Sequence, residues 1–231
     1  MRKRIRNLHI TITSLSGSEK IIFEASKVIC AGFTARNQEL VRKHLEELKQ
    51  LGVPVPSQIP VFYNLPPDIL TTDERIYVDK TETSGEVEAV LLFGKDDVYI
   101  TVGSDHTDRI LEQVDIEKAK NNCPKVIAKE AWRLSEVKNH VDQLILSSYT
   151  SRDESKPYQL GRLADIIDIS TLMKLSGAEG YGVVLFSGTI PTIDGRLRYS
   201  DYFLMKIVDP LMRRTIMHGY EVQIIRKEIK T

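Results

Sequence analysis

The sequence predicts a β-rich α+β fold, in which a curled sheet carries a few covering helices. Short apolar or alternating runs recur along the whole chain and outnumber the segments with helical spacing. Polar or proline-rich connections separate these runs. At 231 residues the chain is long enough to bury a full core, and we expect a single domain over residues 1–231.

The first part of the chain predicts strands followed by a helix. Residues 7–13 alternate strictly and indicate a strand, and one or two further strands are expected within 18–31. Leucine and valine then recur at helical spacing over 37–51, and Gly52 ends this amphipathic helix.

The next connection is rich in proline, with five prolines in residues 53–67. Proline at this density is incompatible with a helix or a central strand, so we expect a stiff, extended connection across the core. Residues 33–67 are therefore expected to form a helix and a proline-rich connection. Tyr63 either lines a pocket or packs against the core.

Two apolar runs between residues 84 and 109 carry three acidic residues. Glu86 and Glu88 are two apart, so a strand would direct both carboxylates to the same face. The second run ends at Asp105, which approaches the two glutamates if the strands pair. Three carboxylates suit a hard cation such as Mg²⁺ or Mn²⁺. The alternative is that Glu86 and Glu88 are solvated on an exposed face.

The second half of the chain predicts helices and closing strands. Helical spacing is seen over 116–122 and 162–175, the latter ended by Gly177. Apolar runs predict strands over 143–149, 183–186, 202–208 and 216–225.

Composition excludes several classes of partner. Acidic and basic residues balance at 32 each, so no global field attracts nucleic acid or an anionic membrane. No basic patch interleaved with aromatics is seen. No long apolar stretch follows the basic N-terminus, so we expect no secretory signal or membrane anchor, and a cytoplasmic protein. Cys30 and Cys123 are far apart and predict buried thiols, with one disulfide as the alternative.

The order of the acidic motifs resembles the fumarylacetoacetate hydrolase superfamily. Its Glu-x-Glu strand is matched by Glu86 and Glu88, and its Asp-x-x-x-Arg by Asp105 and Arg109. Lys125 follows Asp105 by twenty residues, and Gly188-Thr189-Ile190-Pro191 is similar to the superfamily's Gly-Thr-Pro turn. The similarity extends over most of the chain and is greatest to an uncharacterised branch. It implies a mixed β-roll or β-sandwich, a divalent metal and a homodimer.

The resemblance also implies site residues. Glu86, Glu88 and Asp105 would hold Mg²⁺ or Mn²⁺. Lys125 would stabilise an oxyanion or hold the attacking water. Lys129 is the alternative, because the residues around it match the superfamily's local sequence better although its spacing is poorer. The residues that would contact substrate are Arg109, Thr189, Tyr63 and His106, and for His106 the roles of further ligand, ligand partner and proton carrier all remain open.

Two further candidate site residues lie on the helix expected within residues 33–67, which the resemblance implies is a lid. His44 and Glu47 are three apart and therefore neighbours on a helix. The resemblance implies that such a pair positions or deprotonates the attacking water. Here the pair lies about twice as far from Gly32 as in the superfamily's motif. The other departures are Asn64, Glu112 and the inserted Ile190.

The implied function is a divalent-metal-dependent hydrolase or lyase. Its substrate would be a small 2-oxo acid, acylpyruvate-like or sugar-derived, that reacts through a metal-stabilised enolate. Carbon–carbon hydrolysis, decarboxylation, hydration and dehydration are all open. The departures motivate an alternative, a non-catalytic binding or assembly module on the same fold.

Overall fold

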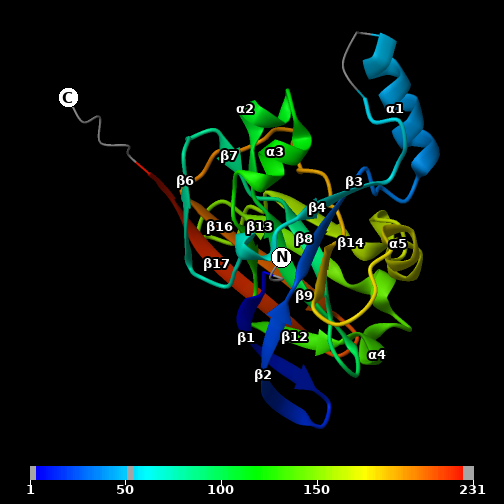
Figure 1. Cartoon of the computed structure of the whole chain (residues 1–231), viewed down its shortest axis with the longest axis vertical. Coiled ribbons are helices and arrows are strands. Elements are labelled where there is room, and N and C mark those ends of the chain that lie inside the picture. Colours follow the sequence, from blue (N-terminus) through cyan, green and yellow to red (C-terminus); the bar gives the residue numbers. More distant parts are fainter. Residues whose placement is uncertain (1–3, 51–54, 226–231) are drawn as a thin grey trace.

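Two packed sheets dominate the computed structural model, which describes residues 4–50 and 55–225 (Figure 1). The larger sheet curls on itself and has the strand order β2-β1-β12-β9-β8-β15-β3-β4, with β11 joining β9 to β5. The smaller sheet has the order β14-β13-β16-β17-β6, and β10 pairs with β7. The predicted β-rich α+β fold is confirmed.

The strands of the larger sheet are β1 (Arg6–Ser14), β2 (Gly17–Ala25), β3 (Lys27–Gly32), β4 (Val61–Leu65), β5 (Leu70–Thr71), β8 (Val87–Phe93), β9 (Val98–Asp105), β11 (Lys125–Ile127), β12 (Glu130–Arg133) and β15 (Val183–Phe186). Those of the smaller sheet are β6 (Arg75–Val78), β13 (Ile145–Tyr149), β14 (Gln159–Arg162), β16 (Tyr202–Asp209) and β17 (Arg214–Ile224). The two-stranded ribbon is β7 (Thr83–Ser84) with β10 (Thr107–Asp108).

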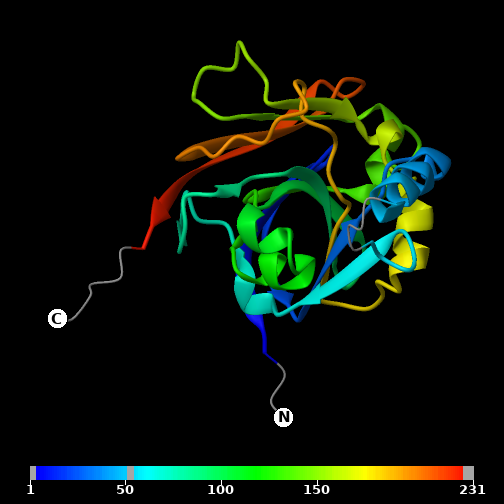
Figure 2. The same ribbon diagram turned by 90° about the horizontal axis from the view of Figure 1, so that it is seen from above.

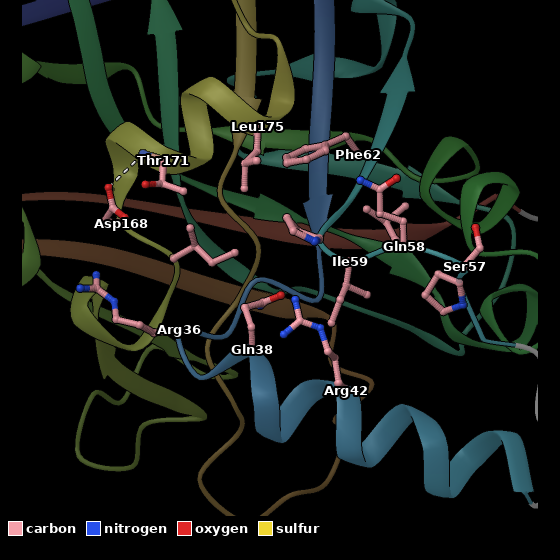
Figure 3. A pocket seen from close by; sticks show the side chains of 14 residues that line it. Arg36, Gln38, Arg42, Ser57, Gln58, Ile59, Phe62, Asp168, Thr171 and Leu175 are labelled. Carbon is pink, nitrogen blue, oxygen red and sulfur yellow. Dashed lines mark hydrogen bonds between the residues drawn. The ribbon is translucent and has the colours of Figure 1, made fainter.

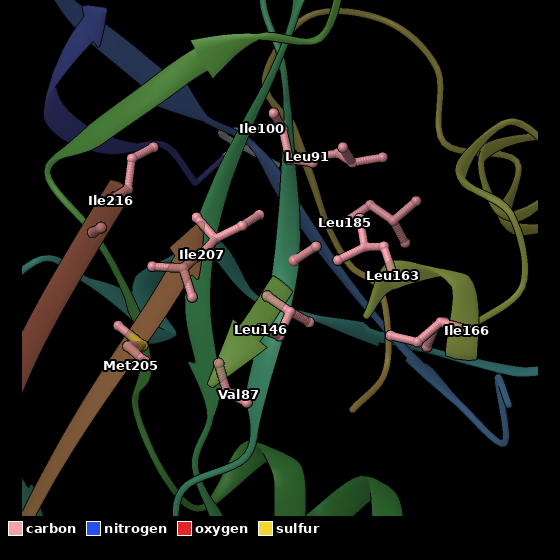
Figure 4. Close-up of a cluster of buried hydrophobic side chains, with 14 of the residues drawn as sticks. Val87, Leu91, Ile100, Leu146, Leu163, Ile166, Leu185, Met205, Ile207 and Ile216 are labelled. Atoms are coloured by element: carbon pink, nitrogen blue, oxygen red, sulfur yellow. The ribbon is translucent and has the colours of Figure 1, made fainter. Parts of the chain in front are cut away.

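Both faces of the central strands of the curled sheet, β8, β9 and β15, are buried. One face packs on the smaller sheet through residues such as Val87, Leu91 and Ile207 (Figure 4). The other face encloses a second apolar cluster that includes Val90 and Leu92. Because side chains alternate along a strand, β8 supplies every second residue to each cluster. This explains why its sequence is apolar throughout apart from Glu88.

The helices lie at the ends and sides of the sheets. They are α1 (Gln38–Gln50), α2 (Arg109–Glu112), α3 (Ile116–Asn121), α4 (Leu134–Val137) and α5 (Ile169–Ser176), with 3₁₀ turns at Pro67–Ile69, Val141–Gln143 and Leu163–Asp165. Seen from above, α2 and α3 cover the opening of the curled sheet (Figure 2). Within the described residues, every helix is too short or too polar to span a membrane.

One expectation about elements is wrong in part, and another gains detail. The helix predicted over 162–175 begins only at Ile169, because Asp168 accepts a hydrogen bond from the backbone N–H of Thr171 and so caps it. The proline-rich connection contains a strand, β4, which pairs with β3 at the edge of the curled sheet. An edge position is one that tolerates neighbouring prolines. The predicted end of the lid helix at Gly52 lies outside the described residues.

Candidate metal centre and active site

Strand register brings the three predicted metal ligands together. β8 and β9 are antiparallel, with Glu88 opposite Gly103, and the N–H of Asp105 donates to the carbonyl of Glu86 at 3.0 Å. Cross-strand neighbours share a face, so all three carboxylates point into the curled sheet. Ligand oxygens of Glu86, Glu88 and Asp105 lie within 4.8 Å of one another. We call these three residues the acidic triad.

Two glycines allow Glu88 to sit deep in this site. A Cβ on Gly103 would lie 2.6 Å from the Cγ2 atom of Val90, so only glycine fits opposite Glu88. Gly188 follows β15 with a φ of +81°, and its N–H donates to Oε2 of Glu88 at 2.8 Å. Glycine adopts this left-handed conformation without the strain that a Cβ would add.

Two lysines neutralise Asp105. Lys125 is opposite Asp105 in the pairing of β11 with β9, and its Nζ lies 2.9 Å from Oδ1 and donates to the carbonyl of His106 at 2.6 Å. Lys120 of α3 donates to Oδ2. Both lysines are buried, at 0% and 5% exposure. Lys129, the alternative to Lys125, is exposed and pairs with Glu74.

The electrostatics of the triad favour a cation. Burial, with the negative charge of Asp105, raises the pKa of Glu88 well above its usual range. Burial would also raise the pKa of Asp105, but Lys120 and Lys125 outweigh it and lower that pKa. A cation beside Glu88 would offset both causes by stabilising its charged form. A buried set of carboxylate oxygens fits Mg²⁺ or Mn²⁺.

Arg109 holds the outermost triad member. It is the first residue of α2, and its Nη2 lies 3.0 Å from Oε1 of Glu86. Its Nη1 contacts Oε2 of Glu112 at 2.8 Å, and its Nε donates to the hydroxyl of Ser84 at 2.7 Å. Burial opposes the charge of Arg109, but Glu86 and Glu112 outweigh it and raise the pKa of the guanidinium. Glu112, a departure from the superfamily, therefore acts as its counter-ion.

His106 faces the smaller sheet. Its Nδ1 lies 3.0 Å from the hydroxyl of Tyr220, its Nε2 lies 2.9 Å from the hydroxyl of Thr83, and its ring meets Phe203 edge-on. Burial, reinforced by Lys125, lowers the pKa of the imidazole to about 3, so the ring is neutral at pH 7. In this arrangement the ring contacts β17 and β7, and the backbone carbonyl anchors Lys125.

Thr189 and Gln159 fix the start of β8. The hydroxyl of Thr189 donates to the carbonyl of Val87 at 2.8 Å and accepts from Nε2 of Gln159 at 2.8 Å. Oε1 of Gln159 accepts from the N–H of Val87 at 3.0 Å and from the hydroxyl of Ser148 at 2.9 Å. Val87 lies between the two glutamates, so Gln159 on β14 positions the acidic strand.

Tyr63 and Cys30 border the site from the edge of the curled sheet. They are opposite each other in the pairing of β3 with β4. The Nζ of Lys120 lies 5.8 Å from the centre of the half-buried Tyr63 ring. Both cysteines are free and buried, as predicted, and burial raises the pKa of each thiol.

The helix that carries the predicted lid pair projects from the sheets in this conformation (Figure 1). α1, which carries His44 and Glu47, extends away from the sheets (Figure 1). Glu47 is on an exposed face, and the side chain of His44 lies outside what the structure describes. A hollow of about 740 Å³ separates the start of α1 from α5 and β4 (Figure 3). Its lining includes Arg42, Phe62 and Thr171 but no member of the triad.

Lys120 is the main residue that sequence reasoning missed. Ile116, Ala119 and Lys120 share one face of α3 by their spacing, and that face turns inward, with Ala119 and Lys120 buried. The available sign of burial was that Lys120 lies four residues after the apolar Ile116 and therefore on the same helix face. Nothing in the local pattern indicated that its partner would be Asp105.

Comparison with known proteins identifies the family and the fold. The model of a family described as "Protein of unknown function (DUF2848)" matches residues 31–220. No curated protein matches the sequence.

Three solved structures have similar folds. A protein assigned to the fumarylacetoacetate hydrolase family from Yersinia pestis CO92 is 19% identical, with a TM-score of 0.62 over 93% of this chain and 100% of that one. 5-Carboxymethyl-2-hydroxymuconate delta-isomerase from Mycobacterium smegmatis is 17% identical, with a TM-score of 0.62 over 96% and 100%. A 2-keto-3-deoxy-D-arabinonate dehydratase complexed with magnesium and 2,5-dioxopentanoate is 17% identical, with a TM-score of 0.58 over 90% and 77%. The resemblance seen in the sequence is therefore confirmed: the chain has the fold of fumarylacetoacetate hydrolase family proteins and belongs to the uncharacterised family DUF2848.

Proposed function

We propose that this chain is a divalent-cation-dependent enzyme that acts on a small 2-oxo acid as a hydrolase or lyase. The observation that carries the proposal is the buried acidic triad, with ligand oxygens within 4.8 Å and two ammonium groups beside it. Structures of the same fold support it. By their names, one such protein is an isomerase and another is a dehydratase complexed with magnesium and an oxo acid.

Glu86, Glu88 and Asp105 would hold the cation. When bound, Mg²⁺ or Mn²⁺ would draw electron density from the keto and carboxylate oxygens of a 2-oxo acid, so that a neighbouring bond breaks more readily. Arg109 orients Glu86 through their 3.0 Å ion pair. Gly188 orients Glu88 through its backbone N–H.

The buried ammonium of Lys125 would meet negative charge that develops on substrate. Its position is fixed by two acceptors, Oδ1 of Asp105 and the carbonyl of His106, so no reorganisation is needed during the reaction. Tyr63 would form a wall of the substrate space beside Lys120. Movement of α1 over the site would bring His44 and Glu47 to a water or a proton. The active form would be a homodimer.

Calorimetric titration with Mg²⁺ and Mn²⁺ tests this proposal, with oxalate as a mimic of the substrate's two oxygens. We expect the wild type to bind cation, and oxalate to bind only when cation is present. Glu88→Gln should abolish both, because it removes a buried anionic ligand. Asp96→Asn, in the exposed turn between β8 and β9, is the matched control and should bind as wild type does.

The absence of cation binding in the wild type would overturn the proposal and favour the binding or assembly module. Turnover of an oxo acid that Lys125→Ala abolishes, with its circular dichroism unchanged, would exclude the module.

A further inference from the structure

Lys120 places a positive charge where the triad would hold a cation. Its Nζ is hydrogen-bonded to Oδ2 of Asp105, and the side chain is 5% exposed. The ligand oxygens of the triad lie within 4.8 Å of one another, so an ammonium bound to Asp105 lies beside all three carboxylates.

The two lysines on Asp105 are held differently. Lys125 extends from a central strand and has two acceptors, Oδ1 of Asp105 and the carbonyl of His106. Lys120 extends from the short helix α3, and among the described residues its Nζ has a single hydrogen-bond acceptor, Oδ2 of Asp105. Lys120 is thus the lysine that can leave Asp105 with the loss of one contact.

The ring of Tyr63 offers a second favourable position for this ammonium. The ring of Tyr63 lies 5.8 Å from Nζ of Lys120, within the range of a cation–π contact. A lysine side chain has four flexible bonds, so its ammonium can move toward the ring while α3 stays in place. Oδ2 of Asp105 would then be open.

We propose that Lys120 is an internal cation that neutralises the triad in the metal-free protein and must leave Oδ2 of Asp105 when a divalent cation binds. The inference rests on the proposed metal site and deepens it. The ammonium of Lys120 competes with a dication for Oδ2 of Asp105, because both use a lone pair of that oxygen and both are positively charged. The ammonium and a dication bound to the same carboxylate would also repel each other strongly in a buried site. Lys120 therefore lowers the affinity for metal and stabilises the protein without it.

Mn²⁺ affinity and thermal stability of the full chain test this role. Lys120→Met keeps the length of the side chain and removes the charge. We expect it to bind Mn²⁺ at least about tenfold more tightly than wild type, because the repulsion is gone. Its metal-free form should melt at a lower temperature than wild type, and saturating Mn²⁺ should raise its melting temperature by more.

Two further variants separate charge at this site from other effects. Lys120→Arg keeps the charge, and its planar fork pairs more firmly with a carboxylate, so Mn²⁺ should bind more weakly than in wild type. Lys118→Met removes a charge from the same helix at an exposed position and should leave affinity unchanged.

The outcomes distinguish this inference from the proposed function. If wild type binds Mn²⁺ and Lys120→Met binds it no more tightly, or Lys120→Arg binds it no more weakly, the internal-cation role is wrong while the metal site stands. If only Lys120→Met binds Mn²⁺, the role of Lys120 is supported and metal dependence of the wild type is refuted. If no variant binds Mn²⁺, both are wrong.

Discussion

The acidic triad and the lid helix represent two kinds of region within one proposed active site. The triad lies on paired strands, where each carboxylate is buried or held by a named partner. α1 carries His44 and Glu47 on a helix that extends away from the sheets. We call the acidic triad and its ion-pair partners the floor of the site, and α1 its lid. The comparison indicates that the floor is fixed by strand register, whereas the lid depends on the position of one helix.

The largest effect is expected from breaking the floor itself. Asp105→Asn would leave Lys120 and Lys125 buried without their anionic partner. Loss of one member of a buried charge network costs about 3–5 kcal/mol in unfolding free energy. Urea denaturation of the metal-free protein measures this loss. The exposed control Asp96→Asn should lie within about 0.5 kcal/mol of wild type, and an equally small loss in Asp105→Asn would contradict the ion pairing.

A smaller effect is expected from loosening the floor while its charges remain. Gln159→Leu removes the acceptor of the N–H of Val87 and one donor to the carbonyl of Ile190. The carbonyl of Ile190 keeps the hydroxyl of Thr189 as a donor at 3.4 Å, so the N–H of Val87 is the group left unpaired. A buried group left unpaired costs about 1–3 kcal/mol, so we expect a loss of that size and weaker Mn²⁺ binding. Gln223→Leu, at an exposed position of β17, controls for the substitution. Full Mn²⁺ affinity in Gln159→Leu would show that β8 holds its position without this side chain.

On the lid side, the cap of α5 gives a pH-dependent prediction. The hydroxyl of Ser170, with the N–H of Thr171, lowers the pKa of Asp168 to about 2, below its ordinary value. A lowered folded-state pKa contributes stability that is present above about pH 4 and lost as pH falls toward 2. Asp168→Ala should therefore cost about 1 kcal/mol at pH 7.

The deficit of Asp168→Ala should shrink between pH 4 and pH 2, as measured by urea denaturation at each pH. Asp168→Asn retains a capping oxygen without the charge, so it should show a smaller deficit at pH 7. A deficit in Asp168→Ala that is independent of pH would mean that the carboxylate charge does not contribute.

The smallest effect is expected in the lid. Glu47→Gln and His44→Asn should change Mn²⁺ affinity by no more than about twofold, because α1 extends away from the sheets (Figure 1) and a distant charge is screened by salt. Calorimetry under the conditions used for Glu88→Gln measures this. A large loss of affinity in either variant would mean that α1 reaches the triad in solution, and the contrast between floor and lid would be wrong.

Sequence patterns predicted the parts of the site that depend on local geometry. The spacing of Glu86 and Glu88, and the end of the next strand at Asp105, follow from alternation and from the pairing of adjacent strands. Lys125 followed from the resemblance. Lys120 and Gln159 meet the triad through contacts between elements distant in sequence, so no local pattern specified their partners. The helix predicted over 162–175 begins later than predicted. The cap at Asp168 starts the helix at Ile169, so the apolar spacing before Asp168 does not extend α5.

The balance of charge in the floor has a consequence for the order of binding. Four carboxylates face three cationic groups: Glu86, Glu88, Asp105 and Glu112 against Arg109, Lys120 and Lys125. With all groups ionised, as ligation of a cation by Glu88 requires, this cluster has an excess of one negative charge before the cation is counted. A dication reverses the sign, and the carboxylate of an oxo acid then restores neutrality. Cation and acid should therefore each strengthen the binding of the other by the same factor, as thermodynamic linkage requires.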